Sequence, residues 1–197
     1  MDTPFDYQPE IVEADTAVIF CLDSDLLITY CNPAWDRFAT ENGGPELRRP
    51  QVIGTCVLDY ISGPARDYYA TAYKRVLAQS KPWQHRYECS SEKVHREFRL
   101  LAIPIKKRPG VFVRNSLDVE HAHQEALSKP LEKVYRQSNG LITMCSGCRR
   151  TRRNLSGVEI WDWVPAFLAL PPAAARQITY GICSTCRELY YPEDEIA

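Results

Sequence analysis

Four cysteines near the end of the chain carry the clearest chemistry in the sequence. Cys145 and Cys148 form one C-x-x-C pair, and Cys183 and Cys186 form a second pair after an interval of 34 residues. Thiolates are favoured ligands of structural Zn²⁺, and two such turns supply the four sulfurs of a tetrahedral site. The sequence therefore predicts a structural zinc ion held by all four cysteines, with no coordination position left open for catalysis.

Other interpretations of these cysteines are open. Buried cysteines can act as small hydrophobic residues, and a C-x-x-C pair can form a disulfide or a redox dithiol. Disulfides are uncommon in cytosolic proteins, and a redox dithiol needs no second pair. The spacing favours zinc, and a thiol redox switch that releases zinc on oxidation is an alternative.

A run of arginines directly follows the first cysteine pair. Arg149, Arg150, Arg152 and Arg153 could contact the phosphates of a nucleic acid or an acidic surface of a protein partner. The segment from residue 141 onward balances its basic side chains with acidic ones, and the whole chain has a formal net charge of −1. A nucleic-acid-binding regulator that uses these arginines is therefore the less favoured alternative.

The residues around the cysteines must form a folded module of their own. Residues 141–144 predict a short strand that leads into Cys145, and the residues after Cys183 predict the start of a helix. Apolar residues between the two pairs would cover the metal, with the expected core at Trp161, Trp163 and Phe167. A unit of this size is marginal without its metal.

The part of the chain before the cysteines alternates strand and helix signals. Two β-rich runs within 17–30 predict a hairpin, and Asn32-Pro33 predicts the capped start of a helix. Helical spacing over 64–79 predicts a longer helix, and three strands follow within 83–117. The predicted fold class is α+β, with helices on one face of a five-stranded antiparallel sheet and a small zinc-stabilised module.

Several stretches of this part resemble a known family. Residues 14–25, the sequence Tyr30-Cys-Asn-Pro-Ala-Trp-Asp-Arg-Phe38, residues 52–55 and the last three strands together resemble a PAS sensor domain over about residues 10–120. The resemblance implies a sensing or protein-interaction module that is often dimeric. It also implies a pocket between the sheet and the helices, whose ligand is unknown.

Two cofactors of PAS proteins are not expected here. The light-sensing flavin subfamily carries a Gly-x-Asn-Cys-Arg segment, whereas this chain has Gly54-Thr-Cys56-Val-Leu58, which shifts the cysteine and lacks the asparagine and arginine. Cys56 is therefore interpreted as a core or pocket-wall residue. Haem-binding relatives use a histidine on the longer helix, and residues 64–79 contain none.

The cysteine segment resembles a second known arrangement. Its cysteine pairs, with Trp161-Asp-Trp-Val-Pro between them, are similar in layout to the treble-clef zinc modules at the end of some bacterial PAS and response-regulator proteins. The resemblance implies a signalling context and adds no reaction. The predicted division of the chain is an N-terminal arm at 1–16, a PAS-like sensor domain at 17–117, a linker at 118–140 and a zinc-binding module at 141–197.

Together these patterns predict a cytoplasmic bacterial signalling or regulatory protein that is not an enzyme. The first residues lack the features of a signal peptide, and no apolar run approaches the roughly 20 residues that cross a bilayer. No glycine-rich phosphate loop or activated nucleophile is found. We expect a protein partner or self-association, for example as a dimer. His121 and His123, in the predicted linker, are interpreted as solvated.

Overall fold

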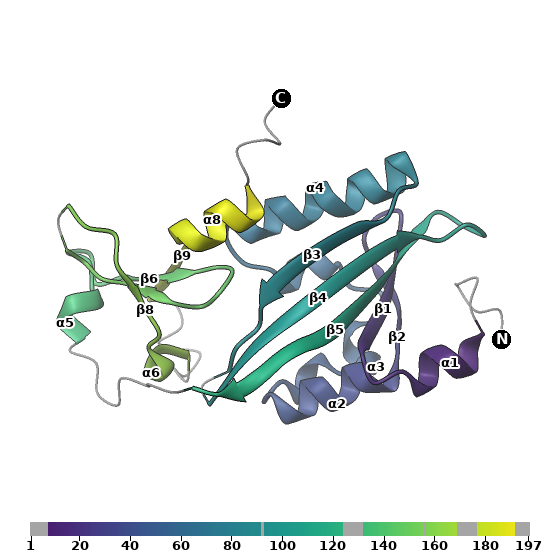
Figure 1. Cartoon of the computed structure of the whole chain (residues 1–197), viewed down its shortest axis with the longest axis horizontal. Helices are drawn as coiled ribbons and strands as arrows, with labels where there is room; N and C mark the ends of the chain where they lie inside the picture. Colours follow the sequence, from purple (N-terminus) through teal and green to yellow (C-terminus); the bar gives the residue numbers. More distant parts are fainter. Residues whose placement is uncertain (1–7, 92, 124–131, 156, 169–176, 192–197) are drawn as a thin grey trace. The chain divides into compact units, whose positions relative to one another are not determined.

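The protein, seen in a computed structural model, is described over residues 8–91, 93–123, 132–155, 157–168 and 177–191 (Figure 1). These residues form two compact units. The first, here the sheet unit, takes its described residues from Met1–Ile61, Tyr69–Tyr87 and Phe98–Asp118. The second, here the cysteine unit, takes its described residues from Ser62–Tyr68, Glu88–Glu97 and Val119–Ala197. The boundaries predicted at residues 16, 117 and 140 stay predictions.

A five-stranded antiparallel sheet with helices confirms the predicted fold class. The strand order is β2-β1-β5-β4-β3, so β5, the last strand of this sheet along the chain, lies in the centre beside β1, the first. The elements are α1 (Pro9–Ala14), β1 (Val18–Asp23), β2 (Ile28–Cys31), α2 (Pro33–Glu41), η1 (Pro45–Leu47), α3 (Arg49–Val52), η2 (Val57–Tyr60), α4 (Pro64–Gln79), β3 (Trp83–Glu88), β4 (Val94–Pro104) and β5 (Gly110–Ala122).

Asn32 follows the β1–β2 hairpin and caps the start of α2, as the Asn-Pro pair predicts. Its side chain is fully buried, and its Oδ1 atom accepts hydrogen bonds from the backbone N–H of Ile19 at 3.0 Å and of Trp35 at 3.3 Å. Its Nδ2 atom donates to the carbonyl oxygen of Ala17 at 2.9 Å. One amide therefore caps the helix and holds the start of β1 at the same time.

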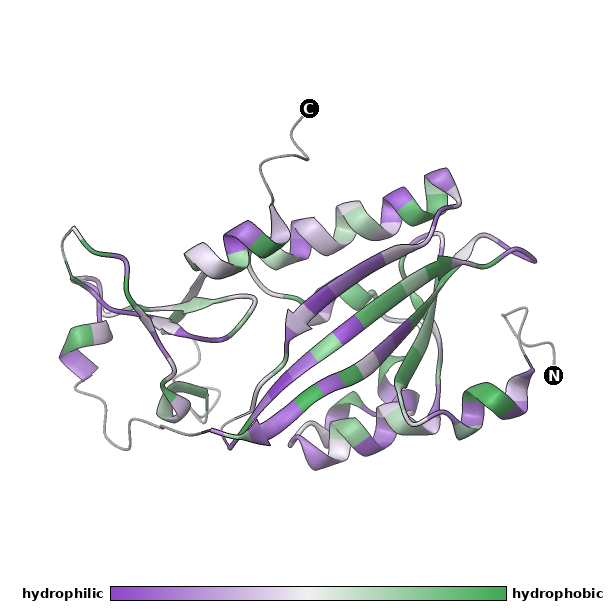
Figure 2. Cartoon of the chain, in the orientation of Figure 1, coloured by the Kyte–Doolittle hydropathy of each residue, from purple (hydrophilic) through white to green (hydrophobic). Residues whose placement is uncertain are grey.

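The two longer helices pack on the sheet through aromatic contacts. The rings of Phe20 on β1 and Trp35 on α2 meet edge-to-face with centroids 5.5 Å apart. The rings of Tyr73 on α4 and Trp83 on β3 meet in the same way at 5.8 Å. Figure 2 shows hydrophobic residues interspersed with hydrophilic ones along β4 and β5, which is typical of strands with one covered face.

Helix α1 adds cover to the opposite face of the sheet. Its buried Val12 packs in one cluster with Ile19 and Cys21. These two residues alternate with Phe20 along β1, so they point away from α2. Helix α1 therefore packs on this chain's own sheet through Val12, while Ile11 beside it is 63% exposed.

A second, smaller sheet organises the cysteine unit. Its strand order is β8-β7-β6-β9, and β6 pairs with β9 in parallel while β6–β7 and β7–β8 are antiparallel. Parallel strands need a long crossover connection, which explains the wide interval between the cysteine pairs. The elements are α5 (Glu132–Tyr135), β6 (Ile142–Cys145), β7 (Thr151–Arg152), β8 (Trp161–Asp162), α6 (Pro165–Leu168), β9 (Ile178–Gly181) and α8 (Ser184–Tyr190).

The core of the cysteine unit differs from the expected one. Phe167 is buried as expected, but Trp161 and Trp163 are only half-buried. The ring of Trp163 stacks on His123 with centroids 4.4 Å apart. The core cluster consists of aliphatic and aromatic side chains drawn from α5, β6 and the α6 region, namely Tyr135, Ile142, Met144, Val164 and Phe167.

The predicted linker begins with ordered sheet. Strand β5 continues to Ala122, so residues 118–122 pair with a neighbouring strand. The rest of the linker up to residue 131 lies outside the described residues, apart from His123, and α5 follows directly. None of the described helices has the length and apolar character needed to cross a bilayer.

Candidate metal centre

The first cysteine pair sits in a tight turn at the end of β6. The backbone N–H of Cys145 donates to the carbonyl of Arg150 at 2.8 Å, and the N–H of Arg149 donates to the carbonyl of Cys145 at 3.1 Å. A side chain on Gly147 would place its Cβ 2.9 Å from the Cys186 sulfur. Only glycine therefore lets this turn approach the second pair so closely.

Parallel pairing of β6 with β9 brings the second cysteine pair to the first. Cys145 lies opposite Gly181 in this register, so the chain turns toward the first pair as it leaves β9. Cys183 then caps α8, and its sulfur accepts a hydrogen bond from the N–H of Cys186 at 3.4 Å. The N–H of Cys183 donates to the sulfur of Cys145 at 3.4 Å.

The four sulfurs form one compact, buried cluster. They all lie within 4.8 Å of one another, and the sulfurs of Cys148 and Cys183 are 3.7 Å apart. A regular tetrahedron with metal–sulfur bonds of about 2.3 Å separates its sulfurs by about 3.8 Å. All four cysteines are free thiols and no more than 6% exposed. The structure thus brings together every residue predicted as a ligand, while metal binding itself stays a prediction.

The acid–base behaviour of the four thiols also suits a cation. Hydrogen bonds from Cys148, Cys183 and Cys186 lower the pKa of Cys145. Hydrogen bonds to Cys145, reinforced by burial, raise the pKa of Cys148 and Cys186. Without a cation, only part of this cluster can lose its protons, because several buried negative charges would repel one another. A divalent cation removes that obstacle and holds all four as thiolates.

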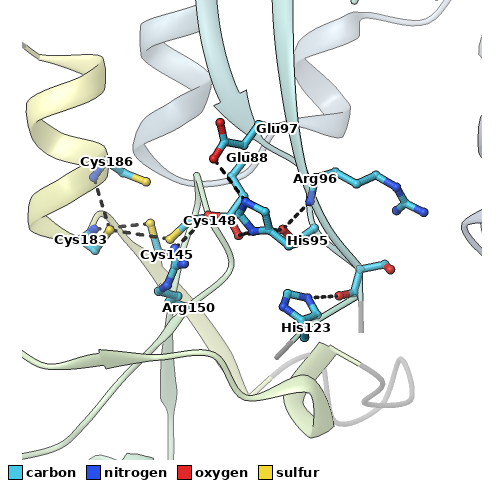
Figure 3. Close-up of polar contacts among 12 residues, drawn as sticks. Glu88, His95, Arg96, Glu97, His123, Cys145, Cys148, Arg150, Cys183 and Cys186 are labelled. Carbon is cyan, nitrogen blue, oxygen red and sulfur yellow. Dashed lines mark hydrogen bonds and ion pairs between the residues drawn. The ribbon is translucent and has the colours of Figure 1, made fainter. Parts of the chain in front are cut away.

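Arg150 supplies a positive charge next to the cluster (Figure 3). Burial opposes that charge, but hydrogen bonding to the Cys148 sulfur and the nearby Glu88 carboxylate outweigh burial and raise the pKa of Arg150. Its Nη1 atom donates to Glu88 Oε2 at 2.9 Å within the same unit. Four thiolates around Zn²⁺ carry a net charge of −2, so a fixed guanidinium beside them is stabilising.

The other predicted arginines do not form a common basic surface. Arg149 lies over the ring of Tyr180, 6.0 Å from its centroid. Arg153 forms an ion pair with Asp162, in which its Nη2 atom donates to Oδ1 at 3.0 Å. Arg152 is exposed and makes no hydrogen bond or ion pair with another described side chain.

Three histidines of the cysteine unit were not expected to cluster. The rings of His95 and His121 stack with centroids 4.8 Å apart, and His123 meets His95 edge-to-face at 6.2 Å. His121 is exposed, as expected of a solvated residue, and His123 is half-buried, but His121 lies in the continuation of β5 and His123 directly follows its last residue, so neither belongs to an irregular linker. The i, i+2 spacing of the two residues is a strand spacing, and it was the signal available in the sequence.

Comparison with known families identifies the first part of the chain. A family model described as the PAS fold matches residues 12–116, which is more than half of the chain. The chain belongs to the PAS fold family. This match confirms the PAS resemblance of the sequence. It ends before the first cysteine pair, so the resemblance of the C-terminal segment to zinc modules stays a prediction.

Solved PAS domains are similar to this part of the chain. The PAS domain of BvgS from Bordetella pertussis has 17% identity and a TM-score of 0.44, covering 56% of this chain and 82% of that domain. The PAS domain of the RpfR quorum-sensing receptor from Cronobacter turicensis has 18% identity and a TM-score of 0.43, with 55% and 99% coverage. The PAS domain of nitrogen regulation protein NR(II) from Vibrio parahaemolyticus has 14% identity and a TM-score of 0.38, with 55% and 95% coverage. No curated protein sequence matches the chain.

Proposed function

We propose that this protein is a cytoplasmic regulator in which a PAS domain senses a signal or docks a partner and a zinc-bound cysteine unit contacts another protein. The observation that carries the proposal is the buried cluster of four sulfurs in a chain that also contains a PAS domain. In this proposal the zinc is structural, because four thiolates fill a tetrahedral site and leave no position for a substrate. No catalytic role is assigned.

The proposed zinc ion is held by Cys145, Cys148, Cys183 and Cys186. When bound, it would supply charge that lets all four cysteines ionise and would tie β6 to the start of α8. The N–H groups that already point at the sulfurs of Cys145 and Cys183 suit thiolate better than thiol, because an ionised sulfur is the stronger acceptor. Arg150 offsets part of the remaining negative charge.

Nucleic-acid binding through the arginine run receives less support than contact with a protein. Of the four arginines, Arg150 forms an ion pair with Glu88 and Arg153 forms one with Asp162. A protein that follows a nucleic-acid backbone needs several free cations, each neutralising one phosphate. The redox alternative would join Cys145 to Cys148 and Cys183 to Cys186 by S–S bonds of about 2.05 Å, whereas all four are free thiols gathered in one cluster.

The structural zinc role is tested by cobalt replacement in the full chain. Tetrahedral Co²⁺ absorbs intensely in the visible, and the intensity of its thiolate charge-transfer absorption in the near ultraviolet increases with the number of bound thiolates, so this intensity distinguishes four sulfurs from fewer. We expect one Co²⁺ per chain with the spectrum of four thiolates. An added small thiol should not alter the spectrum, because the shell is closed. A spectrum that changes with such additions would instead indicate an open, catalytic position.

The proposed role in protein contact has its own test. We expect the zinc-loaded chain to self-associate or to bind a protein partner, and light scattering of the pure chain measures the first directly. A dimeric mass that is kept in the chain whose cysteines hold zinc and lost after chelation would tie self-association to the cysteine unit. A monomeric mass both with zinc and after chelation would exclude self-association, and the proposed contact would then be with a different protein. Hydrolysis or transfer activity of the pure chain would contradict the regulatory assignment.

A further inference from the structure

A polar cavity of about 410 Å³ lies within the cysteine unit, among residues that the proposed zinc role does not use. Its walls come from the turn after α5, from β6 and from β7 and the residues after it. The polar groups that line it are guanidinium, hydroxyl and amide groups, and none of the described lining residues is acidic. These groups include those of Gln137, Ser138, Thr143, Arg152, Arg153 and Asn154.

Backbone hydrogen bonds hold the walls of this cavity in place. The N–H of Asn154 donates to the carbonyl of Val134 at 2.7 Å, and its side-chain Nδ2 donates to the carbonyl of Arg136 at the same distance. The turn at Gln137 is closed by the N–H of Gly140, which donates to the Gln137 carbonyl at 2.9 Å. The cavity is therefore formed before any ligand binds, which lowers the ordering cost of binding.

The charge of the cavity is positive and only partly neutralised. Arg153 is paired with Asp162, so its own charge is offset and its side chain is held in place. Arg152, in contrast, makes no ion pair or hydrogen bond with a side chain in the described part of the cysteine unit. The nearby Asp162 carboxylate is already bonded by Arg153 and by the Tyr135 hydroxyl, so the guanidinium fork of Arg152 is left to favour an anion, and its geometry matches a phosphate or carboxylate.

Two hydroxyl groups add donors beside Arg152. Thr143 Oγ1 accepts a hydrogen bond from Gln137 Nε2 at 2.5 Å, so its own hydrogen remains available for a ligand. Ser138 makes no side-chain hydrogen bond within the described residues. A fork and two hydroxyls on different walls suit an anion with oxygens in several directions, which is the shape of a tetrahedral phosphate.

We propose that this cavity binds the phosphate group of a small phosphorylated molecule. Its volume is within the range of about 300–1,000 Å³ typical of small-molecule sites and exceeds the need of a bare phosphate ion. The exposed Leu155 at its edge offers apolar contact to the rest of the ligand. A nucleic-acid backbone is the poorer fit, since a single unpaired arginine neutralises one phosphate and not a row of them.

The experiment is calorimetric titration of the zinc-loaded full chain with inorganic phosphate, adenosine monophosphate, unphosphorylated adenosine and a single-stranded oligonucleotide. We expect both phosphate compounds to bind, adenosine not to bind, and Arg152→Gln to weaken binding by about tenfold or more. Ser138→Ala should weaken it by a smaller factor. The matched control is Arg37→Gln, which removes another exposed arginine, from α2 in the sheet unit, and should leave binding unchanged.

The arms of this experiment separate the sources of the phosphate. Tighter binding of adenosine monophosphate than of inorganic phosphate supports a phosphorylated metabolite, and equal binding supports the phosphate group with no role for Leu155. Affinity that grows with oligonucleotide length and falls with Arg152→Gln would replace the proposal by a nucleic-acid surface. Equal binding of adenosine and its monophosphate would overturn it. So would the absence of heat with every phosphate compound up to about 10 mM.

The zinc content and the thermal melting of each variant are measured to show whether a loss of phosphate binding results from misfolding. Arg152 is exposed, so its replacement should change neither quantity. If Arg152→Gln nevertheless lost zinc, Ser138→Ala, which leaves all charges in place, would decide the proposal. Unaltered phosphate binding in that variant and in Arg152→Lys would count against the site.

Discussion

The sheet unit and the cysteine unit bury their chains to very different degrees. Of the eleven largest fully buried side chains among the described residues, Ile142, Met144 and Val164 belong to the cysteine unit, and the others lie in the sheet unit. Hydrophobic burial is the main stabilising term of small domains, so the sheet unit can fold by packing alone. The cysteine unit instead gathers four thiols at its centre, and we infer that a metal replaces the missing core.

The comparison teaches that one chain can stabilise neighbouring units by separate means. Apolar contacts weaken gradually as side chains are trimmed, whereas a metal site is lost almost completely when one ligand or the metal is removed.

Removing the metal should unfold the cysteine unit and leave the sheet unit intact. Structural zinc contributes an apparent binding free energy of about 10 kcal/mol or more, which three large buried side chains cannot replace. After treatment with a strong chelator, amide hydrogen exchange should become fast in β6 and β9 while β1 and β5 up to Asn115 stay protected. Cys145→Ser should give the same pattern.

The matched control for this prediction is Cys56→Ser, which removes a half-buried thiol from the sheet unit. It should keep the zinc content and the exchange pattern of the unmodified chain. Loss of exchange protection in both units on chelation would show that the two units unfold together. It would contradict the claim that the sheet unit is stable without the metal.

Two isoleucines provide a matched pair for the hydrophobic side of the comparison. Ile19 on β1 and Ile142 on β6 are both 0% exposed. Ile19→Ala should lower the unfolding free energy of the sheet unit by about 2–5 kcal/mol, from lost burial and the cavity left behind. Ile142→Ala should leave the unfolding of the sheet unit unchanged and weaken zinc binding instead. Hydrogen exchange in urea, followed strand by strand, measures both.

A buried histidine should make the sheet unit sensitive to acid. Burial lowers the pKa of His85 to about 4, whereas the unfolded chain takes up this proton near pH 6.5. As the pH falls from 6.5 to 4, the unfolded state gains a proton that the folded state does not bind, so stability is lost. The loss from this residue is about 3 kcal/mol at most.

His85→Phe should remove this loss, and urea unfolding between pH 7 and 4 measures it. The ring stacks on Trp83 with centroids 5.5 Å apart, so an aromatic replacement keeps the contact. In spite of burial, hydrogen bonds and charge from Arg49 lower the pKa of Asp36, so the stability that Asp36 contributes is lost mainly below about pH 5. The loss caused by His85 begins at higher pH. An unchanged pH dependence in His85→Phe would refute the assignment.

The smallest predicted effect concerns the charge beside the metal. Arg150→Gln should weaken zinc binding by about 10- to 100-fold, the usual cost of losing a partner of the metal ligands. Arg152→Gln, two residues further along, is the control and should leave zinc affinity unchanged, because Arg152 does not contact the cluster. Competition with a zinc-binding dye gives both affinities. Equal affinity of the two variants would mean that Glu88 and Arg150 serve packing alone.

Local signals in the sequence were enough to predict much of the sheet unit. The Asn32-Pro33 start of α2 and the alternating strands near Phe98 depend on neighbouring residues, so short patterns reveal them. The candidate ligands were also visible, because the C-x-x-C spacing is itself a short pattern. Metal binding was implied by the residue types alone.

The arrangement around the cysteines depended on contacts between distant residues and could not be predicted in this way. The parallel register that sets Cys145 opposite Gly181 joins strands separated by the whole crossover. The ion pair of Arg150 with Glu88 spans 62 residues. Trp163 was expected in the core, yet it stacks on His123, because the aliphatic residues of β6 fill the interior. No periodic pattern in the sequence encodes such pairings.

The most direct measurement is zinc-edge X-ray absorption on the full chain, together with its zinc content. We predict one zinc ion per chain surrounded by four sulfurs at about 2.3 Å. A shell that contains nitrogen or oxygen, or a chain that keeps the cysteine unit folded with no bound metal, would contradict the claim that four thiolates and a cation hold this unit together.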